Sequence, residues 1–295
     1  MGIAIQAYAP AHGGGRQTFS RDQFWGLVMV VPYVAVFLML VVYPVGYGLY
    51  LGSDADSYRR LFNDPAYWQT VRNTLVFLLV AVNIKLFAAL LISGFFLNKS
   101  VWVRVVALIF VLPWAVPSFI SILSFRWMLN AEWGMLNGLI FKLTGSFGYP
   151  WLLDKNMALG WIIVVHIWKW LPFWTLIMLA GRLAIPTDLY EAAEMDGATG
   201  LQKFRFVTVP SIAALYFTST VLSTIWSLGD FNSVYLLTGG GPGDNTHLLA
   251  TLGIRYGFGQ NDVGTATASV ITALPLLVPL VIVMLHWIRK QEAAR

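Results

Sequence analysis

The chain has 295 residues, of which 58% are hydrophobic and only 11% are charged, with a net charge of +5. A soluble domain carries about 25% charged residues, so this composition excludes a soluble fold and a disordered chain and predicts an integral membrane protein. The absence of cysteine excludes disulfides, thiolate metal sites and cysteine nucleophiles. The Lys and Arg residues are too scattered to form a nucleic-acid site.

Six stretches of the chain are apolar over the roughly 20 residues that a helix needs to cross a bilayer. Each stretch is continuous rather than alternating, which predicts membrane helices and not barrel strands. An N-terminus inside the cell places more Lys and Arg on the inner segments, so we expect both termini to be cytoplasmic. The predicted spans are residues 25–50, 71–97, 103–128, 157–181, 211–236 and 263–287.

The spans predict a simple organisation: a cytoplasmic segment (1–24), a transmembrane domain (25–290) and a cytoplasmic tail (291–295). The first span is too long for the core of a signal peptide, so we expect it to remain as an anchor. Seven of the 13 prolines fall within the spans. Each removes a helix hydrogen bond, which favours a bundle with kinks and cavities, as in transporters.

A long predicted inner loop, residues 183–210, separates the fourth and fifth spans. Asp188 is the predicted N-cap of a helix, with Glu191 three residues later in capping-box position. Gly197 is the predicted C-cap, where a left-handed backbone is needed, and a second helix is expected from about Thr199. The unit would protrude from the inner membrane surface, although a plain amphipathic surface helix explains the pattern about equally well.

This loop resembles the cytoplasmic EAA loop of the permease subunits of binding-protein-dependent ABC importers. The residues that match the pattern are Glu191, Ala192, Ala193, Asp196, Gly197 and Pro210. In that family the loop forms a coupling helix that docks on the ATPase subunit. The resemblance therefore implies that all of these residues except Pro210 take part in ATPase coupling, with Glu191 and Gly197 central. Val209 departs from the T-L-P ending of many relatives.

Further motifs are similar to the carbohydrate branch of this family, the maltose-type permeases. Residues 168–173 (W-K-W-L-P-F) look like its W-K/R-x-x-P-F stretch, and residues 112–117 are similar to its third-helix motif. Residues 230–232 (D-F-N) and 237–242 (L-T-G-G-G-P) also resemble this branch. The resemblance implies an all-α, multi-pass protein of the bacterial inner membrane with about six transmembrane helices and the type I ABC importer permease fold.

The resemblance also implies a function and a set of partners. The chain would be a permease subunit and not an enzyme, forming with a second permease the pathway for an oligosaccharide or related sugar. A periplasmic solute-binding protein would deliver the sugar, and two ATPase subunits would drive transport. The chain has no G-x-x-x-x-G-K-[ST] phosphate loop, so ATP and Mg would belong to those ATPase subunits and no cofactor to this chain.

The alternative function is a stand-alone secondary transporter or channel for a small polar solute. It would require an inverted repeat and a coupling-ion site, and no clear repeat is visible in the sequence. The four histidines are far apart in the sequence and predict neither a metal site nor a His–carboxylate cluster.

Lys85 and Lys169 fall inside predicted spans, where an ionisable side chain is costly and is by default functional. Each could line a water-filled path, pair with a carboxylate of a partner subunit, or bind a free helix carbonyl. For Lys169 the last role is favoured, because Pro172 leaves a carbonyl free nearby.

The fifth span supplies the main candidates for contact with the sugar. Ser219, Ser223, Trp226 and Asp230 are separated by helical steps that place them on one face. An aromatic face can cover the apolar side of a sugar ring while a carboxylate binds its hydroxyls. The two serines are assigned to helix packing. The predicted pathway residues are Trp226, Asp230, Asn232, Tyr235 and Lys169.

Overall fold

The structure is a computed structural model that describes residues 21–275, 277–279, 281–283 and 286. All regular structure in these ranges is helical, in agreement with the all-α prediction. The chain divides into two compact units, one ending at Gly48 and the other starting at Leu49. The predicted segments 1–24 and 291–295 lie wholly or mostly outside the described residues.

One continuous apolar helix follows the undescribed start of the chain. α1 (Arg21–Phe37) passes through a π-helical turn, η1 (Leu38–Val42), into α2 (Tyr43–Leu51). The ring of Pro44 would clash with the carbonyl four residues earlier in a regular α-helix, and the wider π turn accommodates this clash. The apolar stretch covers 28 residues, which agrees with the first predicted span.

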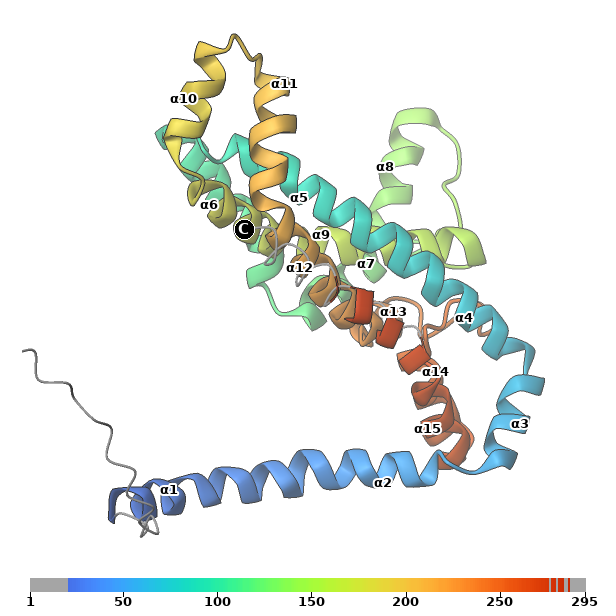
Figure 1. Cartoon of the computed structure of the whole chain (residues 1–295). Coiled ribbons are helices and arrows are strands. Elements are labelled where there is room, and N and C mark those ends of the chain that lie inside the picture. Colours follow the sequence, from blue (N-terminus) through green and yellow to red (C-terminus); the bar gives the residue numbers. More distant parts are fainter. Residues whose placement is uncertain (1–20, 276, 280, 284–285, 287–295) are drawn as a thin grey trace, which may run out of the picture. The chain divides into compact units, whose positions relative to one another are not determined.

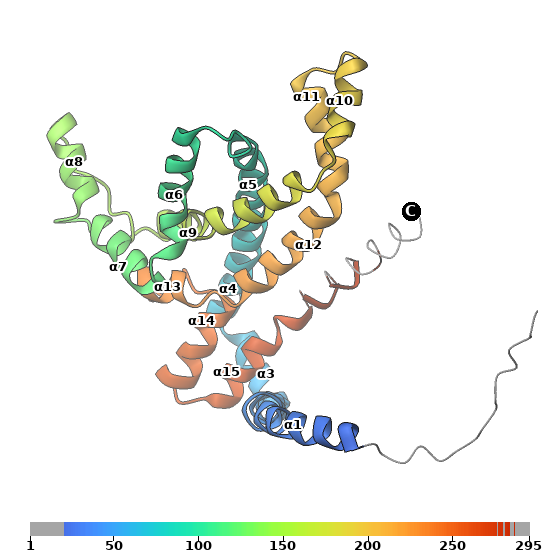
Figure 2. The same cartoon turned by 90° about the vertical axis from the view of Figure 1, so that its left-hand side faces the viewer.

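The second unit contains the remaining helices (Figures 1 and 2). Before the fourth predicted span they are α3 (Ala55–Asn63), α4 (Pro65–Phe77), η2 (Leu78–Val82), α5 (Asn83–Phe95), α6 (Val101–Ala115), α7 (Ser118–Met128) and α8 (Met135–Thr144). From there they are α9 (Lys155–Leu183), α10 (Thr187–Met195), α11 (Gly200–Lys203), η3 (Phe204–Thr208), α12 (Val209–Leu228), α13 (Asn232–Leu237), α14 (Leu249–Ile254), η4 (Arg255–Gly259) and α15 (Val263–Ile271).

Among the described residues, 4 helices are long and apolar enough to cross a membrane, and a bent pair makes a fifth span. The four helices are Phe24–Leu51, Pro65–Phe95, Lys155–Leu183 and Gly200–Leu228. The fifth predicted span, 211–236, was too long at its outer end, because the helix stops at Leu228 before Gly229. Of the sixth predicted span, 263–287, α15 forms the start, and five of the later residues are not described.

The bent pair is formed by α6 and α7, which meet at an angle of 91°. The sequence predicts one span over residues 103–128, and the structure breaks it at Val116 and Pro117. Pro117 has no backbone N–H to continue the helix, and it forces the preceding residue into an extended conformation. Val116 accordingly has ψ 137°.

α9 is the central helix of the second unit, and it packs against α5, α6, α12 and α13. Its first half buries Ile162 and Val165 beside Phe77 of α4. Its second half buries Trp174 and Met178 in a cluster that includes residues of α5 and α12. Because α9 is apolar over most of its circumference, other helices cover it on several sides. The polar side chains on α9 are therefore held inside the unit.

Candidate functional site

The predicted coupling loop forms a helical hairpin, α10 and α11, that projects beyond the other helices of the second unit (Figures 1 and 2). α10 begins at Thr187 after Pro186, so the predicted N-cap role of Asp188 is wrong, and this residue lies in the first turn. Gly197 has φ +78°, the left-handed conformation that its predicted C-cap role requires. Thr199 forms a capping box with Gln202 at the start of α11, where the second helix is predicted.

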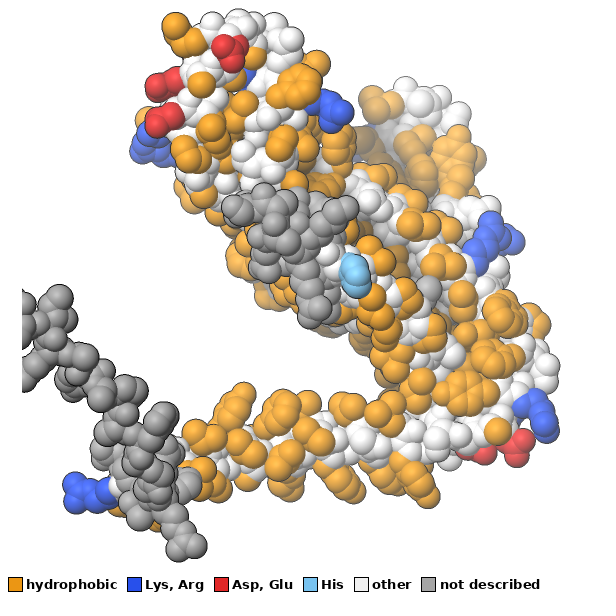
Figure 3. Space-filling view, viewed as in Figure 1, with side chains coloured by type: hydrophobic (Ala, Val, Ile, Leu, Met, Phe, Trp, Pro, Cys, Tyr) orange, Lys and Arg blue, Asp and Glu red, His pale blue; other side chains and the backbone are white. Residues whose placement is uncertain are grey.

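The predicted coupling residues lie on the outer surface of this hairpin. Glu191, Ala192, Asp196 and Gly197 are exposed, and Ala193 is half-buried. Acidic and basic side chains gather on the hairpin, whereas hydrophobic side chains cover most of the helices next to it (Figure 3). The hairpin therefore lies where the chain is polar enough to meet water.

Large apolar side chains are also exposed on the hairpin and its return into α12. Met195, Leu201 and Phe206 are 89%, 78% and 72% exposed. Together with small Ala192, these side chains offer a mixed apolar and charged surface. An apolar surface rimmed by polar residues is typical of a protein-binding site.

Two contacts tie the hairpin and the turn η3 that follows it to the rest of the second unit, and an ion pair closes the hairpin itself. The hydroxyl of Tyr190 lies 2.9 Å from that of Thr208 in η3. Lys203 forms an ion pair with Glu194 across the hairpin. The guanidinium of Arg182, in the last turn of α9, lies 5.3 Å from the ring centroid of Phe204. Motion of the hairpin would therefore reach α9 and α12 directly.

Lys169 supports the bend between α6 and α7. Its ammonium donates to the carbonyl of Pro113 at 2.8 Å and to that of Val116, and it lies 3.4 Å from the carbonyl of Trp114. The predicted role of binding free helix carbonyls is therefore observed. The carbonyls belong to the broken third span, however, and not to the turn before Pro172.

A cavity of about 220 Å³ lies between α5, α9 and the end of α12. Its lining residues are Lys85, His166, Trp170, Trp174, Trp226, Ser227, Gly229, Asp230, Phe231 and Asn232. Three of the predicted pathway residues, Trp226, Asp230 and Asn232, thus come together. Lys169 and Tyr235 do not line it, and Tyr235 stacks on Phe231 with 4.6 Å between ring centroids. Asp230 does not share the helical face of Trp226, because α12 ends at Leu228.

A buried hydrogen-bonded chain crosses one wall of this cavity. Lys85 Nζ lies 2.9 Å from His166 Nε2, and His166 Nδ1 lies 2.6 Å from Asp230 Oδ2. Lys85 and His166 are only 1% and 2% exposed. The carboxylate accepts the Nδ1 hydrogen, which leaves Nε2 to accept from the ammonium. The expectation of no His–carboxylate cluster was wrong, because the three residues come from separate helices that pack together.

Aromatic side chains form the other wall of the cavity. The ring centroid of Trp226 lies 5.5 Å from Phe173, 5.6 Å from Trp174 and 6.1 Å from Trp170. Trp174 is buried, but Trp226 is 48% exposed, so the cavity is open on that side of the chain. The sequence assigned Trp226 to this site and missed the tryptophans of α9. Their helical spacing of four residues was an available signal.

Comparison with known proteins decides the family. Residues 85–291 match the family described as binding-protein-dependent transport system inner membrane component. The chain belongs to this family. The resemblance drawn from the EAA loop is confirmed: the chain is a multi-pass inner-membrane permease subunit, and such subunits are not themselves enzymes.

Two relatives are similar to this permease along most of its length. The trehalose/maltose transport system permease of Thermococcus litoralis is 31% identical, with 90% of this chain and 94% of the relative covered. The sulfoquinovosyl glycerol transport system permease of Agrobacterium fabrum is 30% identical, with 92% of each chain covered. The permease therefore resembles sugar permeases, as its motifs predict.

A solved structure supports the fold. A chain of a bacterial ABC transporter that imports the acidic polysaccharide alginate superposes with a TM-score of 0.81 at 20% identity, covering 92% of this permease and 96% of that chain. This likeness confirms the type I ABC importer permease fold, and the predicted count of about six spans fits it.

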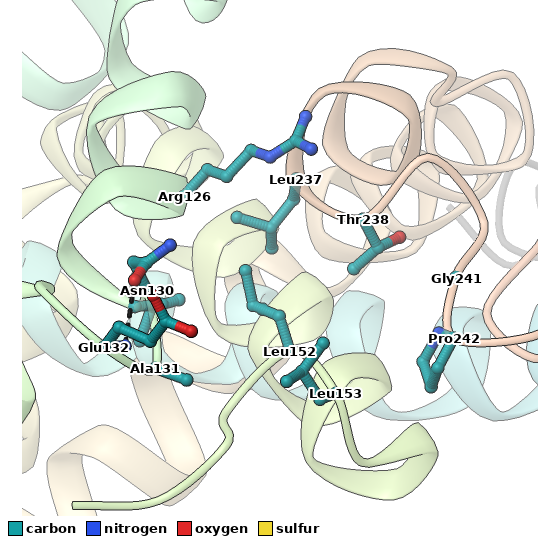
Figure 4. A pocket seen from close by; sticks show the side chains of 11 residues that line it. Arg126, Asn130, Ala131, Glu132, Leu152, Leu153, Leu237, Thr238, Gly241 and Pro242 are labelled. Atoms are coloured by element: carbon teal, nitrogen blue, oxygen red, sulfur yellow. Dashed lines mark hydrogen bonds between the residues drawn. The ribbon is translucent and has the colours of Figure 1, made fainter.

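The permease has a second cavity, of about 370 Å³, at the ends of α7 and α9 that lie away from the hairpin. Leu152, Leu153 and Leu237 form its middle, with Asn130 and Glu132 on one side (Figure 4). Other lining residues are Arg126, Leu129, Ala131, Thr238, Gly241 and Pro242. α9 has 29 residues, so its rise separates this cavity from the α10–α11 hairpin by about 43 Å.

Ion pairs at the same end of the permease join segments that are distant in the sequence. Arg255 pairs with Asp64 at 3.4 Å and with Asp244 at 2.8 Å. Burial raises the pKa of Asp64, but the hydrogen bond from Tyr256, at 2.6 Å, and those from Ala66 and Arg255 lower the pKa by more. The net pKa of Asp64 lies below its ordinary value. The carboxylate therefore stays charged and holds η4 against the start of α4.

Proposed function

We propose that this permease forms, with a second related permease, the membrane pathway for a carbohydrate. A solute-binding protein delivers the sugar, and two separate ATPase subunits drive its import. One observation carries the proposal: three tryptophans and a buried polar chain line the same cavity. Aromatic faces cover the C–H surface of a sugar ring, and polar groups bind its hydroxyls. The sugar specificity of the relatives supports the same class of substrate.

The pathway residues in this proposal are Trp226, Asp230 and Asn232 at the cavity. Trp226 stacks on the sugar, and Asn232 makes hydrogen bonds, because its side-chain amide has no hydrogen bond within the described residues. Lys169 and Tyr235 do not touch the sugar but support the cavity. Lys169 keeps the α6–α7 bend in place, and Tyr235 stacks on Phe231, which lines the cavity. The cavity volume of about 220 Å³ lies below the roughly 300–1,000 Å³ of pockets for drug-sized ligands, so the cavity suits one sugar unit rather than a whole oligosaccharide.

The α10–α11 hairpin is the site at which the ATPase subunits attach. Glu191, Ala192, Ala193, Asp196 and Gly197 dock on an ATPase subunit, and the small alanines allow close approach. Closure of the ATPase pair moves the hairpin, and the Arg182–Phe204 and Tyr190–Thr208 contacts pass this motion to α9 and α12. ATP and Mg are bound by the ATPase subunits.

The test is purification of the tagged permease from its own host, followed by reconstitution of whatever complex is obtained. We expect a second permease and an ATPase to co-purify, and saccharide uptake to depend on ATP. A permease that purifies alone and transports without ATP would instead be a secondary transporter or channel. Uptake of amino acids and of no saccharide would refute the substrate class.

Two variants of the hairpin sharpen the test. Glu191→Arg reverses a docking charge, and Gly197→Val places a β-branched residue at φ +78°. Both should lower ATP-driven uptake at least tenfold while the permease still inserts in the membrane. Gly200→Ala is the matched control, because a Cβ there meets open space. Uptake equal to wild type in both docking variants would refute the assignment of the hairpin.

A further inference from the structure

The hydrogen-bond acceptors of Asp230 and His166 in the cavity are largely committed within the protein. Oδ2 of Asp230 accepts from His166 at 2.6 Å and from the hydroxyl of Ser233, and Oδ1 accepts from the Ser233 backbone N–H at 3.1 Å. The Nε2 of His166 accepts from Lys85. Asp230 therefore positions the imidazole, and its carboxylate has little capacity left for the hydroxyls of a bound sugar.

The donors in the cavity, in contrast, exceed what the protein uses. The ammonium of Lys85 has three N–H groups. One points to His166 Nε2 at 2.9 Å, and a second reaches Ser227 Oγ only at 3.5 Å. The indole N–H groups of Trp170, Trp174 and Trp226 also lack a hydrogen-bond partner within the part of the chain that the structure describes. The cavity therefore favours a ligand rich in acceptors.

The charge of Lys85 also favours a ligand that carries acceptor groups, and specifically a negatively charged one. No carboxylate lies within ion-pair distance of its ammonium among the described residues. The nearest one along the chain of hydrogen bonds, Asp230, is on the far side of the imidazole ring. A buried cation without a direct counter-ion is costly in a low-dielectric interior, and a bound anion offsets that cost. Lys85 is on the cavity wall, where a ligand can supply the anion.

We infer that Lys85 selects saccharides that carry an acidic group, a carboxylate or a sulfonate, on the sugar unit held in this cavity. The acidic group pairs with the Lys85 ammonium, and the apolar face of the ring lies against Trp226. The Lys85–His166–Asp230 chain is the positioning device that aims the ammonium into the cavity. This inference rests on the proposed function and narrows its substrate class.

The test uses the complete transporter with its own binding protein in proteoliposomes and compares matched saccharides. Each pair contains a neutral oligosaccharide of glucose units and the same oligosaccharide with a glucuronic acid unit, and a 6-sulfonated glucose glycoside is a third probe. We expect ATP-driven uptake of the acidic member to exceed that of the neutral member at least tenfold. Preferred uptake of neutral saccharides overturns the inference and leaves the proposed function intact. Uptake of no saccharide at all defeats both.

Variants of Lys85 locate the preference in this cavity. Lys85→Met should reduce the ratio of acidic to neutral uptake tenfold or more, whereas Lys85→Arg keeps the cation and should retain the preference. The matched control is Lys142→Met, because Lys142 is exposed on α8. An unchanged ratio in Lys85→Met overturns the inference. If that variant fails to insert, the wild-type comparison of acidic and neutral saccharides still decides the question.

Discussion

His166 on α9 and Asp230 after α12 form a buried pair, with 2.6 Å between Nδ1 and Oδ2, although 64 residues separate them in the sequence. The same imidazole accepts from Lys85 on its other nitrogen. One histidine thereby connects three membrane segments and aligns the polar wall of the cavity. The pair fixes which ring nitrogen carries the hydrogen, because an ionised carboxylate can only accept.

The first prediction concerns Asp230, the charged end of the hydrogen-bonded chain. Asp230→Asn removes the charged acceptor of both His166 and Ser233. A hydrogen bond to a charged group contributes about 1.5–3 kcal/mol, so we expect a lower thermal midpoint of the purified complex and reduced uptake. Asp56→Asn is the control, because its ion pair with Arg59 at 3.5 Å is exposed and contributes about 0.2–1 kcal/mol. Equal effects of the two variants would contradict the buried pair.

The second prediction concerns the bend between α6 and α7. Lys169→Met leaves the carbonyls of Pro113 and Val116 without their donor. Each partly buried carbonyl left without a donor costs up to about 3 kcal/mol, so the variant should unfold at a clearly lower temperature in detergent. Lys142→Met, at an exposed site, should leave the midpoint unchanged. A stable Lys169→Met variant would show that the bend does not depend on this side chain.

The third prediction compares two glycines four residues apart at the start of α8. A Cβ on Gly134 would collide with the backbone oxygens of Met128 and Asn130, whereas a Cβ on Gly138 meets open space. Gly134→Ala should therefore destabilise the permease by about 1–3 kcal/mol. Gly138→Ala should stabilise it by about 0.5–1 kcal/mol, because alanine is the better helix former. Thermal unfolding of both variants measures the difference, and effects of the same sign would disprove it.

The fourth prediction is a pH dependence that arises at His247. Burial lowers the pKa of His247 below its ordinary value of 6.5, and this effect outweighs the opposite effect of Asp244 at 3.2 Å. The unfolded chain thus binds a proton at higher pH than the folded one. The contribution of His247 to the free energy of unfolding is therefore fully present above pH 6.5. It is lost as the pH falls through the folded pKa.

Thermal midpoints of the wild type and of His247→Gln between pH 8 and pH 5 provide the measurement. The wild type should lose stability more steeply than the variant on acidification, because other titrating groups contribute equally to both. Parallel pH profiles would contradict the prediction, because they would show that the pKa of His247 is the same in the folded and the unfolded state. The hydrogen bond from Asn73 to the carbonyl of His247 is unaffected by the variant and preserves the loop backbone.

Local patterns were sufficient for the features that depend on neighbouring residues. Apolar length predicted the long helices, because a helix in lipid satisfies its own backbone groups. The EAA pattern identified the hairpin, and Gly197 was recognised as the left-handed position because such a backbone disfavours side chains. The wrong N-cap prediction at Asp188 also concerned neighbouring residues only, because α10 begins two residues earlier, directly after Pro186.

The composition and the motifs of the sequence thus determined that this chain is a membrane permease and where its α10–α11 hairpin lies. Only the tertiary structure decided how the cavity is built. Lys85, His166 and Asp230 have no fixed spacing, and nothing local relates them. They meet because membrane interiors lack water, so ionisable side chains on different helices must satisfy one another. That same requirement left Lys85 on the wall of the cavity, and the inferred preference for an acidic sugar rests on this position.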